Sequence, residues 1–429
     1  MLLIRNGRLL DPASKTDAQL DVLLDGERIV EIAPAGKISR GSQPGVEIFD
    51  AAGLVVAPGF IDLHCHLREP GQESSETIET GMRAAARGGF TAICCMPNTR
   101  PVNDNASVTR FILDRAGAAA QNGGVRVWPV GAASLSSRGE AIAEIAAMKR
   151  AGIVAVSDDG KPVATAKLMR QVMDYCRGLD LPVIEHAEDV SLAAGAVMRE
   201  GVRSARLGLS GMPAAAESVC VARDVQLAEL TGARLHIAHL SAQASLEQVR
   251  WARQHGLRVT CEVTPHHFTL TDEDVKYDSC YKMNPPLASR EDREALLAGL
   301  ADGSVEAIAT DHAPHELALK DVEFDRAPFG IIGFETALAL ALEQLVHSGR
   351  LPLLRMVELF TAGPARVLGI ERKLAPGQPA DVTIFSAEHA WTYKVDESAS
   401  KSRNSPFDGR NFRGAPMATI VAGRVVFKR

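Results

Sequence analysis

Short runs of hydrophobic residues recur through the middle of the chain, and longer stretches of helical character separate them. Three of these helical stretches are Glu76–Arg87, Ser107–Ala119 and Ala216–Leu230. Eight runs have the length and apolar character of buried strands: Leu54–Leu63, Thr91–Met96, Val125–Val130, Ile153–Val156, Leu181–Ile184, Arg234–Ala238, Arg258–Val263 and Val305–Ala309. Buried strands that alternate with helices predict either a (β/α)8 barrel of the TIM type or a doubly wound open sheet. The count of eight favours the barrel.

Both ends of the chain have a different pattern, in which short β-type segments alternate with turn pairs such as Asn6-Gly7, Asp25-Gly26 and Ala422-Gly423. The segments are Leu2–Arg5, Leu20–Leu24, Arg28–Ile32, Asp381–Phe385, Thr419–Val421 and Val425–Phe427. Neither end is long enough to form a robust sheet alone. We therefore expect residues 1–54 and 373–429 to form one small β-rich domain beside a barrel of residues 55–372. Truncation of either end should destabilise that small domain.

The composition is that of an ordinary globular protein, with 429 residues, 46% hydrophobic and 23% charged. A net charge of −6 and 5% aromatic residues give no basic or stacking surface for nucleic acid. No apolar run is long enough to span a membrane, and the N-terminus lacks a signal-peptide core. The seven cysteines include no CxxC pair and indicate reduced thiols. We therefore expect a cytoplasmic protein.

Polar residues suited to metal binding follow the predicted strands. They are His64 and His66 after strand one, Asn98 after strand two, Asp158 and Asp159 after strand four, His186 after strand five, His239 after strand six, and Asp311 and His312 after strand eight. The carboxyl ends of barrel strands open onto one face, where the active sites of this fold lie. Imidazole and carboxylate ligands suit Zn²⁺ or a similar divalent ion.

The spacing within these segments separates ligands from neighbours. His64 and His66 are two residues apart on a strand and therefore point to the same face, whereas Cys65 points to the other. His236 and His239 are three apart, so a continuous strand would point them to opposite faces. Only one of the two should then be a ligand, and His239 lies nearer the carboxyl end.

A single histidine at a strand end is usually a structural residue. Four histidines and two aspartates at five strand ends are hard to explain as separate accidents of packing. Asp158 and Asp159 are adjacent, so one of them must point away from the site. His266 and His267 have a weaker case, and we assign them to a loop or to a supporting position around the site.

Several longer segments resemble the bacterial dihydroorotases of class I, within the amidohydrolase superfamily. Residues 59–71, GFIDLHCHLREPG, resemble the first metal motif of that family. Further matches follow in the same order at residues 96–101, 157–160, 185–188, 263–267, 282–287, 309–315, 327–330 and 404–407. The HxH pair alone marks only the superfamily. HLREPG, NPPL and DHAPH together are much more specific.

The resemblance implies a hydrolytic metal site that holds one or two Zn²⁺ ions per subunit. In the family pattern His64, His66 and Asp311 hold one ion, and His186 and His239 hold the second.

The bridging position departs from part of the superfamily. Hydantoinases and some dihydroorotases carry a carboxylated lysine after strand four, whereas this chain has Asp158 and Asp159 there, as the class I enzymes do. By that pattern Asp159 bridges the two ions and Asp158 does not. Lys161 lies two residues further into the loop.

The implied reaction is the reversible hydrolysis of the cyclic amide of (S)-dihydroorotate to N-carbamoyl-L-aspartate, a step of pyrimidine (UMP) biosynthesis. A metal-activated hydroxide attacks the ring carbonyl, and Asp311 acts as general acid and base. Arg68 offers a bidentate fork for the substrate carboxylate. The full set of substrate contacts implied by the family is His66, Arg68, Asn98, Asn284, His315, Phe329 and Gly330.

Two other functions compete with this interpretation. A hydantoinase or allantoinase would share the fold and the metals, but it would not need Arg68 and would usually carry the lysine. A non-catalytic dihydroorotase-like chain would serve to hold aspartate transcarbamoylase, but such chains have lost metal ligands, and here every ligand position is filled. We expect a homo-oligomer, in which an association with aspartate transcarbamoylase can coexist with catalysis. Residues 312–328 are rich in charge and predict a loop over the barrel mouth, with a role as a lid as a hypothesis.

Overall fold

The hydrophobic runs of the middle of the chain form a curved parallel sheet of eight strands in the computed structural model, which describes residues 1–42, 44–121 and 123–429. Neighbours in the sheet follow the order of the chain: β6 Phe60–Cys65, β7 Phe90–Cys95, β8 Arg126–Gly131, β9 Ala155–Val156, β10 Val183–Glu185, β13 Leu235–Ile237, β14 Val259–Val263 and β15 Ala307–Ile308. The predicted (β/α)8 barrel is confirmed.

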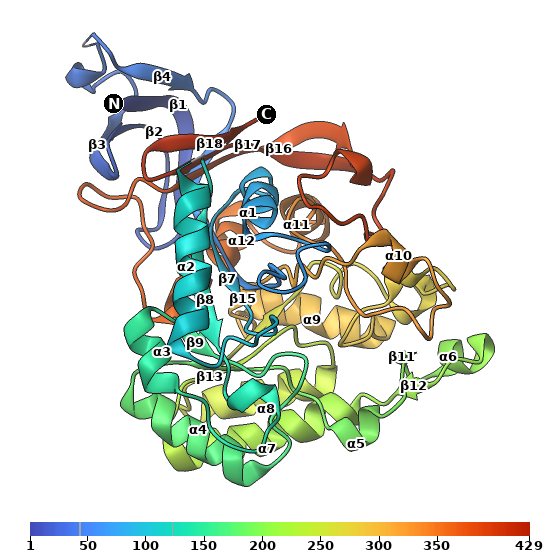
Figure 1. Cartoon of the computed structure of the whole chain (residues 1–429). Helices are drawn as coiled ribbons and strands as arrows, with labels where there is room; N and C mark the ends of the chain where they lie inside the picture. Colours follow the sequence, from blue (N-terminus) through green and yellow to red (C-terminus); the bar gives the residue numbers. More distant parts are fainter. Residues whose placement is uncertain (43, 122) are drawn as a thin grey trace.

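Helices follow the strands and pack around the barrel (Figure 1). The larger ones are α1 Ile78–Arg87, α2 Ala106–Ala120, α3 Ile145–Ala151, α4 Ala166–Gly178, α7 Ala215–Thr231, α8 Gln243–Gln254, α9 Arg290–Asp302, α11 Ala337–Ala341, α12 Leu353–Phe360 and α13 Ala362–Leu368. The three helices predicted from periodicity correspond to α1, α2 and α7. Side-chain caps fix several starts; Thr77 accepts a hydrogen bond from the Thr80 amide at α1, and Asn105 does the same for α2.

Side-chain and backbone hydrogen bonds join the first barrel strand to the last. Asp62 accepts hydrogen bonds from the backbone N–H of Thr310 at 2.7 Å and from its hydroxyl at 2.8 Å. The N–H of His66 donates to the carbonyl of His312 at 2.9 Å. These contacts bring the end of β15 beside the end of β6 and nearly close the barrel.

A second sheet of eight strands contains both ends of the chain, and both termini lie at it in Figure 1. Its order is β18 Arg424–Lys428, β17 Asn411–Val421, β16 Val382–Thr392, β5 Val55–Pro58, β1 Leu2–Asp11, β2 Thr16–Asp25 and β3 Arg28–Pro34, with β4 Glu47–Asp50 beside β1. The strand β5 thus pairs with β1 from one end and β16 from the other. The division into domains at residues 54 and 373 stays a prediction.

Two strand predictions at this sheet were wrong. The run Leu54–Leu63 is not one barrel strand, because β5 belongs to the terminal sheet and only β6 to the barrel. The chain changes sheets at Gly59, where a Cβ would lie 2.2 Å from the Thr91 hydroxyl. The Asn6-Gly7 pair is not a turn between strands. It forms a bulge within the continuous β1, with Asn6 at φ 63°.

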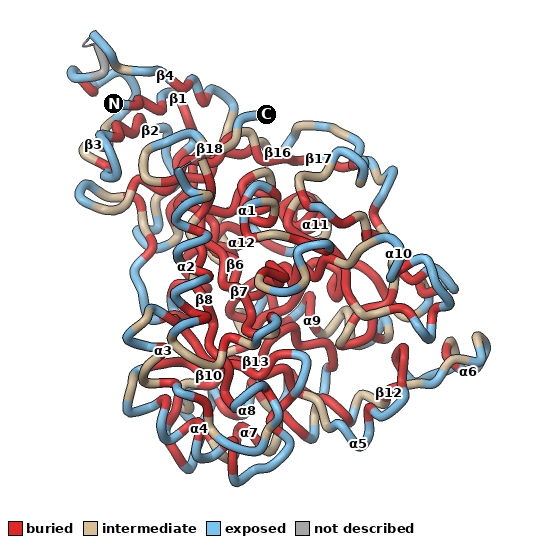
Figure 2. Tube along the Cα trace, viewed as in Figure 1, coloured by how far each residue is buried: buried red, intermediate tan, exposed pale blue. Residues whose placement is uncertain are grey.

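The terminal sheet and the barrel share a buried interface. Arg372 donates to the carbonyl of Gly59 at 2.9 Å and to the carboxylate of Asp381 at 2.9 Å. Beside it, the ring of Phe60 stacks on Phe360 at 5.1 Å and meets Phe385 of β16 at 5.9 Å. Figure 2 shows buried residues running through the barrel strands into this contact.

Shorter elements lie at the barrel mouth and on the outer surface. The strands β11 and β12 flank an arm that projects from the body and ends in α6 (Figure 1). The remaining elements are β11 Met198–Arg199, β12 Gly211–Met212, α5 Val190–Ala193, α6 Val202–Leu207, α10 Leu317–Lys320, a π-helix at Leu342–His347, and 3-10 turns at Ser39–Ser42, Leu135–Ser137, Asp272–Asp274, Ser279–Tyr281 and Val395–Glu397.

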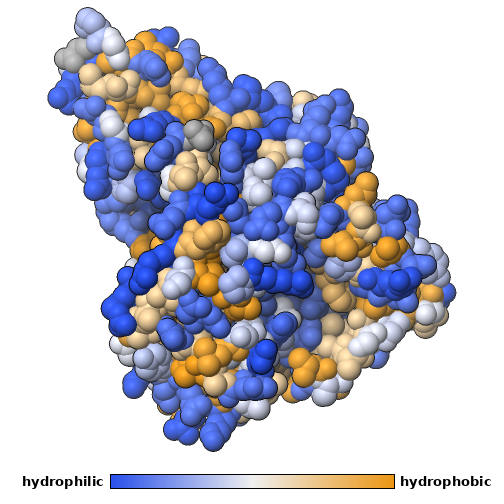
Figure 3. Space-filling model, in the orientation of Figure 1, coloured by the Kyte–Doolittle hydropathy of each residue, from blue (hydrophilic) through white to orange (hydrophobic). Residues whose placement is uncertain are grey.

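No helix in the described residues is both long and apolar enough to cross a membrane. The face drawn in Figure 3 is largely hydrophilic, and its apolar patches lie apart from one another.

Candidate active site

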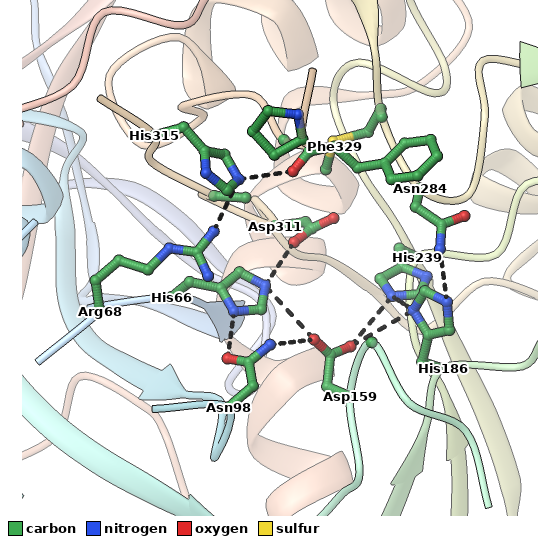
Figure 4. A pocket seen from close by; sticks show the side chains of 15 residues that line it. His66, Arg68, Asn98, Asp159, His186, His239, Asn284, Asp311, His315 and Phe329 are labelled. Atoms are coloured by element: carbon green, nitrogen blue, oxygen red, sulfur yellow. Dashed lines mark hydrogen bonds and ion pairs between the residues drawn. The ribbon is translucent and has the colours of Figure 1, made fainter. Parts of the chain in front are cut away.

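A cavity of about 290 Å³ opens at the carboxyl ends of the barrel strands. Figure 4 shows charged and polar side chains pointing into it from several strand ends. Its lining comprises His66, Arg68, Asn98, Asp159, Gly160, His186, His239, Met283, Asn284, Asp311, Ala313, His315, Pro328, Phe329 and Gly330. The structure therefore brings together His66, Asn98, Asp159, His186, His239 and Asp311 from the strand ends. His64 lies directly beneath, with no exposed surface. His312 instead lies outside the cavity, with its Nε2 3.4 Å from Glu76.

Two groups of side chains at the base of the cavity have the spacing of metal ligands. His64, His66 and Asp311 form one group, and His64, Asp159 and His239 form the other, with ligand atoms within 4.8 Å in each. The Nε2 of His64 is 3.3 Å from Asp159 Oδ1 and 3.6 Å from Asp311 Oδ1. The Nε2 of His66 lies 3.1 Å from Asp311 Oδ1.

Asp159 lies between the two halves of this cluster. Its Oδ2 is 3.6 Å from His66 Nε2, and its Oδ1 is 3.6 Å from His186 Nδ1 and 3.5 Å from His239 Nε2. Asp158 points the other way and accepts hydrogen bonds from the backbone of Ala133–Ser134 at 2.9 and 3.1 Å. Of the two adjacent aspartates, only Asp159 faces the cluster.

Several polar atoms of the cluster are buried and lack hydrogen-bond partners among the described residues. They include both ring nitrogens of His64, Oδ1 of Asp159 and Nδ1 of His239. Burying such atoms unpaired costs free energy. A divalent cation between His64 Nε2 and Asp159 Oδ1 would satisfy both, and the imidazole and carboxylate donors are those that zinc accepts. The residues present therefore fit a metal ion.

The pKa shifts within the cluster also indicate a site for a cation. Burial alone would raise the pKa of Asp159, but the neighbouring imidazoles of His64, His186 and His239 lower it well below its usual range. Burial would lower the pKa of His186, but its hydrogen bonds to Asp159 and Glu188 raise it to about 10. The carboxylates thus favour the positively charged form of His186 and of His64, whose pKa is also raised by Asp159. A metal cation would supply that charge and displace the protons.

The structure corrects one prediction about histidine spacing. β13 ends at Ile237, and His239 has a left-handed φ of 32°, so the strand does not continue between His236 and His239. Both side chains consequently reach the inside of the barrel. His239 faces Asp159, whereas His236 lies deeper and donates to Glu262 Oε2 at 3.1 Å.

Arg68 lines the opposite side of the cavity from Asn284 and is 9% exposed (Figure 4). Its Nε donates to the carbonyl of Pro314 at 3.0 Å, and one terminal nitrogen lies 3.2 Å from Nε2 of His315. Burial lowers the pKa of Arg68 to about 10, so the guanidinium stays charged at neutral pH. Burial and the Arg68 charge lower the pKa of His315 to about 3, so this imidazole is neutral. Its Nε2 is 2.7 Å from the carbonyl of Phe329.

Two asparagines connect the cavity wall to the histidines. Asn98 places Oδ1 2.9 Å from His66 Nδ1 and its amide nitrogen 3.4 Å from Asp159. Asn284 donates to Glu188 at 2.8 Å and has its amide nitrogen 3.1 Å from His186 Nε2. The Oδ1 of Asn284 has no hydrogen-bond partner in the described part of the chain.

The loop over the cavity is fixed by hydrogen bonds from Asn404 and Lys320. Asn404 donates to the carbonyls of Ala313 and Gly330, both at 2.9 Å, and accepts from the N–H of His315 at 3.1 Å. The amine of Lys320, on α10, donates to the carbonyls of Pro328 at 3.0 Å and Gly330 at 3.2 Å. Gly330 has φ 149°, and a Cβ there would lie 2.6 Å from the Ala313 carbonyl oxygen.

Three residues of this neighbourhood are not among those predicted from the sequence. Glu188 lies beside His186, Asn404 holds the loop, and Glu262 lies behind His64. Glu262 had a visible signal, because it is an acid inside an otherwise apolar strand. The only sequence signal for Asn404 was its position in a segment that resembles the family, residues 404–407.

His266 and His267 lie in the turn that follows β14, and both are buried at 1% exposure. His267 lies between the Thr264 hydroxyl at 2.7 Å and the Pro285 carbonyl at 2.8 Å. It thereby ties the end of β14 to the segment that carries Asn284.

A (β/α)8 barrel with histidines and aspartates gathered at its carboxyl end is the architecture of metal-dependent amidohydrolases. A family model described as "Dihydro-orotase-like" matches residues 53–245. The dihydroorotase of Solibacter usitatus is 56% identical over 430 residues, which cover 100% of this chain and 98% of that protein. The dihydroorotase of Pelobacter propionicus is 50% identical over 432 residues, with full coverage (100%) of both. The chain belongs to the dihydroorotase family and is a cyclic amidohydrolase.

Solved structures give the same fold. The L-hydantoinase from Arthrobacter aurescens superposes with a TM-score of 0.88 at 25% identity and covers 100% of this chain and 96% of its own. The D-hydantoinase from Thermus sp. has a TM-score of 0.82 at 24% identity, over 99% and 95% of the two chains. The barrel and the terminal sheet are therefore shared with the hydantoinases.

Proposed function

We propose that this protein catalyses the reversible hydrolysis of (S)-dihydroorotate to N-carbamoyl-L-aspartate, in pyrimidine biosynthesis. The observation that carries the proposal is one cavity with a buried arginine on one wall and a two-carboxylate, four-histidine cluster at its base. The substrate has the matching parts, a carboxylate and a cyclic amide. The identity to dihydroorotases over the full chain supports this choice of substrate.

Six residues would hold the metal, which we propose to be one or two Zn²⁺ ions. His64, His66 and Asp311 would hold one ion and His186 and His239 the other, with Asp159 between them, as its distances to both halves support. When bound, the metal lowers the pKa of a water molecule toward neutrality and polarises the amide carbonyl.

We propose that Asp311 moves the proton in this reaction. Its Oδ1 lies 3.1 Å from His66 Nε2, and the residue lines the cavity. Burial would raise the pKa of Asp311, but the charge of His64 and the hydrogen bond to His66 lower it below its usual range, so the carboxylate is ionised. It takes the proton of the attacking water and returns it to the leaving ring nitrogen. In the synthetic direction the same steps run in reverse.

Arg68 binds the substrate carboxylate. Its Nε donates to the Pro314 carbonyl, so the terminal nitrogens remain available on the cavity side. They would donate a charge-assisted pair of hydrogen bonds to the carboxylate. Asn98 and His315 lie on either side of it in the cavity and contribute further contacts. His66 borders the same space, next to the reacting carbonyl.

The remaining contacts orient the ring. The free Oδ1 of Asn284 is an acceptor for a ring N–H, while its amide nitrogen is held by Glu188. The backbone of Phe329 and Gly330 closes the other side. Because Gly330 is pinned by Asn404 and Lys320, this backbone is positioned before substrate arrives.

The test separates this function from that of a hydantoinase. Purified, zinc-loaded protein should hydrolyse dihydroorotate and form it from carbamoyl aspartate, with little turnover of hydantoin. Arg68 favours dihydroorotate, because a hydantoin ring offers no carboxylate for the buried guanidinium. Turnover of hydantoin without turnover of dihydroorotate would refute the assignment.

The assembly and the location of the enzyme are part of the proposal. We expect a homo-oligomer in the cytoplasm, and an association with aspartate transcarbamoylase is compatible with catalysis. Light scattering after size exclusion measures the oligomeric state. Co-purification with a tagged aspartate transcarbamoylase tests the complex.

A further inference from the structure

A fully buried carboxylate lies behind the candidate metal site, outside the cavity. Glu262 on β14 has no exposed surface, and its Oε1 is 3.5 Å from Nδ1 of His64. The other ring nitrogen of His64 faces Asp159 and Asp311, at 3.3 and 3.6 Å. The second oxygen of Glu262 is 3.1 Å from Nε2 of His236. Glu262 therefore connects a residue of the metal cluster to a histidine deep in the barrel.

Strand geometry explains how these side chains meet. Cys261 and Val263 pack into the hydrophobic layer between strands and helices, so Thr260 and Glu262, which alternate with them, point inward. His236 of β13 pairs in register with Thr260, and its Nδ1 lies 2.8 Å from the threonine hydroxyl. Because the Glu262 carboxylate accepts, a neutral His236 carries its proton on Nε2, and the threonine hydroxyl can donate to Nδ1.

Barrel packing alone does not account for an acid at this position. Removing a carboxylate from water costs several kcal/mol, and apolar residues of similar volume usually serve a core as well or better. Here each oxygen of Glu262 faces an imidazole nitrogen, and one of those imidazoles belongs to the metal cluster. The hydrogen bond with His236 offsets part of the cost of burial, and Oε1 of Glu262 has no nearer partner in the described residues than Nδ1 of His64.

The chemistry of imidazole gives this contact a specific effect. A neutral histidine carries one ring proton, and the nitrogen that lacks it is the one that binds a metal. Glu262 can only accept, so it favours the His64 tautomer with the proton on Nδ1. The Nε2 lone pair is then directed at Asp159 and Asp311. The opposite tautomer would place a proton where the metal must bind.

Glu262 lies outside the cavity, whereas two of the residues that contact the other cluster histidines line it. Nδ1 of His66 faces the amide oxygen of Asn98, and Nε2 of His186 faces Glu188 and Asn284. Asn98 and Asn284 line the cavity, where a bound substrate can reach them. Glu262 does not line the cavity and can act only through His64.

We propose that Glu262 is a positioning residue of the metal site, which holds His64 in the metal-binding tautomer and orientation, with His236 as its buried partner. The inference rests on the proposed function, because it takes His64 as a metal ligand. Glu262 itself touches neither metal nor substrate.

The first test is the affinity of the purified protein for Zn²⁺, measured by competition with a chromophoric chelator. Glu262→Gln keeps the side-chain shape, but its single amide oxygen can accept a hydrogen bond from only one of the two histidines. We expect its zinc affinity to fall about 10- to 100-fold, the usual effect of losing such a partner. Glu262→Met, which accepts from neither, should lose at least as much. Asp11→Asn is the matched control, since it removes a buried carboxylate of the terminal sheet that is held by the N–H groups of Ala13 and Leu374.

The second test needs no folded variant at residue 262. Nitrogen-15 NMR of the zinc-loaded wild type, with His64→Asn for assignment, should show His64 protonated on Nδ1 and coordinated through Nε2. Wild-type zinc affinity in folded Glu262→Gln, or His64 coordinated through Nδ1, would overturn the inference while the enzyme activity stands. A wild type that neither binds zinc nor hydrolyses dihydroorotate would instead remove the proposed function.

Discussion

Arg68→Met is the substitution that most directly tests how the substrate is recognised. The change removes the guanidinium but keeps most of the apolar stem, which matters because the side chain is buried. The cavity wall should keep its shape, since the loop beside Arg68 is also held by Asn404 and Lys320. The variant therefore removes one positive charge from the site with little change in packing.

The size of the effect follows from the burial of the arginine. Truncating one partner of a buried, hydrogen-bonded charge pair costs about 2 to 5 kcal/mol. This corresponds to a loss of about 30- to several-thousand-fold in kcat/KM for dihydroorotate. If Arg68 holds the substrate equally in the ground and transition states, most of the loss lies in KM.

The assay compares two substrates that differ only in the group Arg68 is proposed to bind. Dihydrouracil is the same ring without the carboxylate, so Arg68→Met should change its slow hydrolysis little. Arg100→Met, which removes an exposed arginine nearby, controls for the general loss of positive charge. An equal loss for both substrates would refute the reasoning, because Arg68 would then act on the ring or on the fold rather than on the carboxylate.

Four further predictions test the site and the fold. Asp159→Ala should lose bound zinc and dihydroorotate hydrolysis together, and unchanged metal content and rate would remove Asp159 from the site. Asn404→Ala should raise KM about tenfold or more with zinc content unchanged, since its three hydrogen bonds hold the cavity loop; a normal KM would contradict this. Asp381→Asn should cost about 3 to 5 kcal/mol in the free energy of unfolding at pH 7, because it leaves the buried Arg372 unpaired. Burial would raise the pKa of Asp381, but Arg126 and Arg372 lower it, so its contribution is present above the unfolded pKa and is lost as pH falls through the folded one. The difference from wild type should therefore vanish in acid, and a difference that persists there would argue against the ion pair. If residues 312–328 act as a lid, carbamoyl aspartate should slow cleavage by a Glu-specific protease at Glu323, and equal rates would count against a lid.

The barrel could be predicted because its signals are local. Each strand is a short apolar run, and helices follow the strands in a repeated order. The boundary at Leu54–Leu63 could not be predicted in the same way, because hydrophobicity does not change where the chain leaves one sheet for the other. The physical signal was Gly59, whose missing side chain leaves room for Thr91. That contact joins residues of different strands and is visible only in three dimensions.

The candidate ligands could be predicted for a related reason. In a parallel barrel the carboxyl ends of all strands share one face, so His186 and Asp311 can be placed together without knowing any contact between them. His236 and His239 would point to opposite faces only on a regular strand, as we had predicted. That prediction was wrong because His239 takes a left-handed backbone conformation, so the side chains of both histidines enter the barrel.

The contacts of His236 could not be predicted from the positions of strand ends. Strand ends predict which side chains face the substrate, because the direction of a strand is a property of the backbone. They do not predict what supports those side chains from behind, because such contacts depend on which strands are neighbours and on their register. His236 meets Glu262 through the pairing of β13 with β14, and Glu262 reaches His64 across the barrel interior. An acid within an apolar strand is therefore informative in itself. Its burial has to be offset by specific partners, and in a barrel whose mouth binds metal the ligands lie within reach.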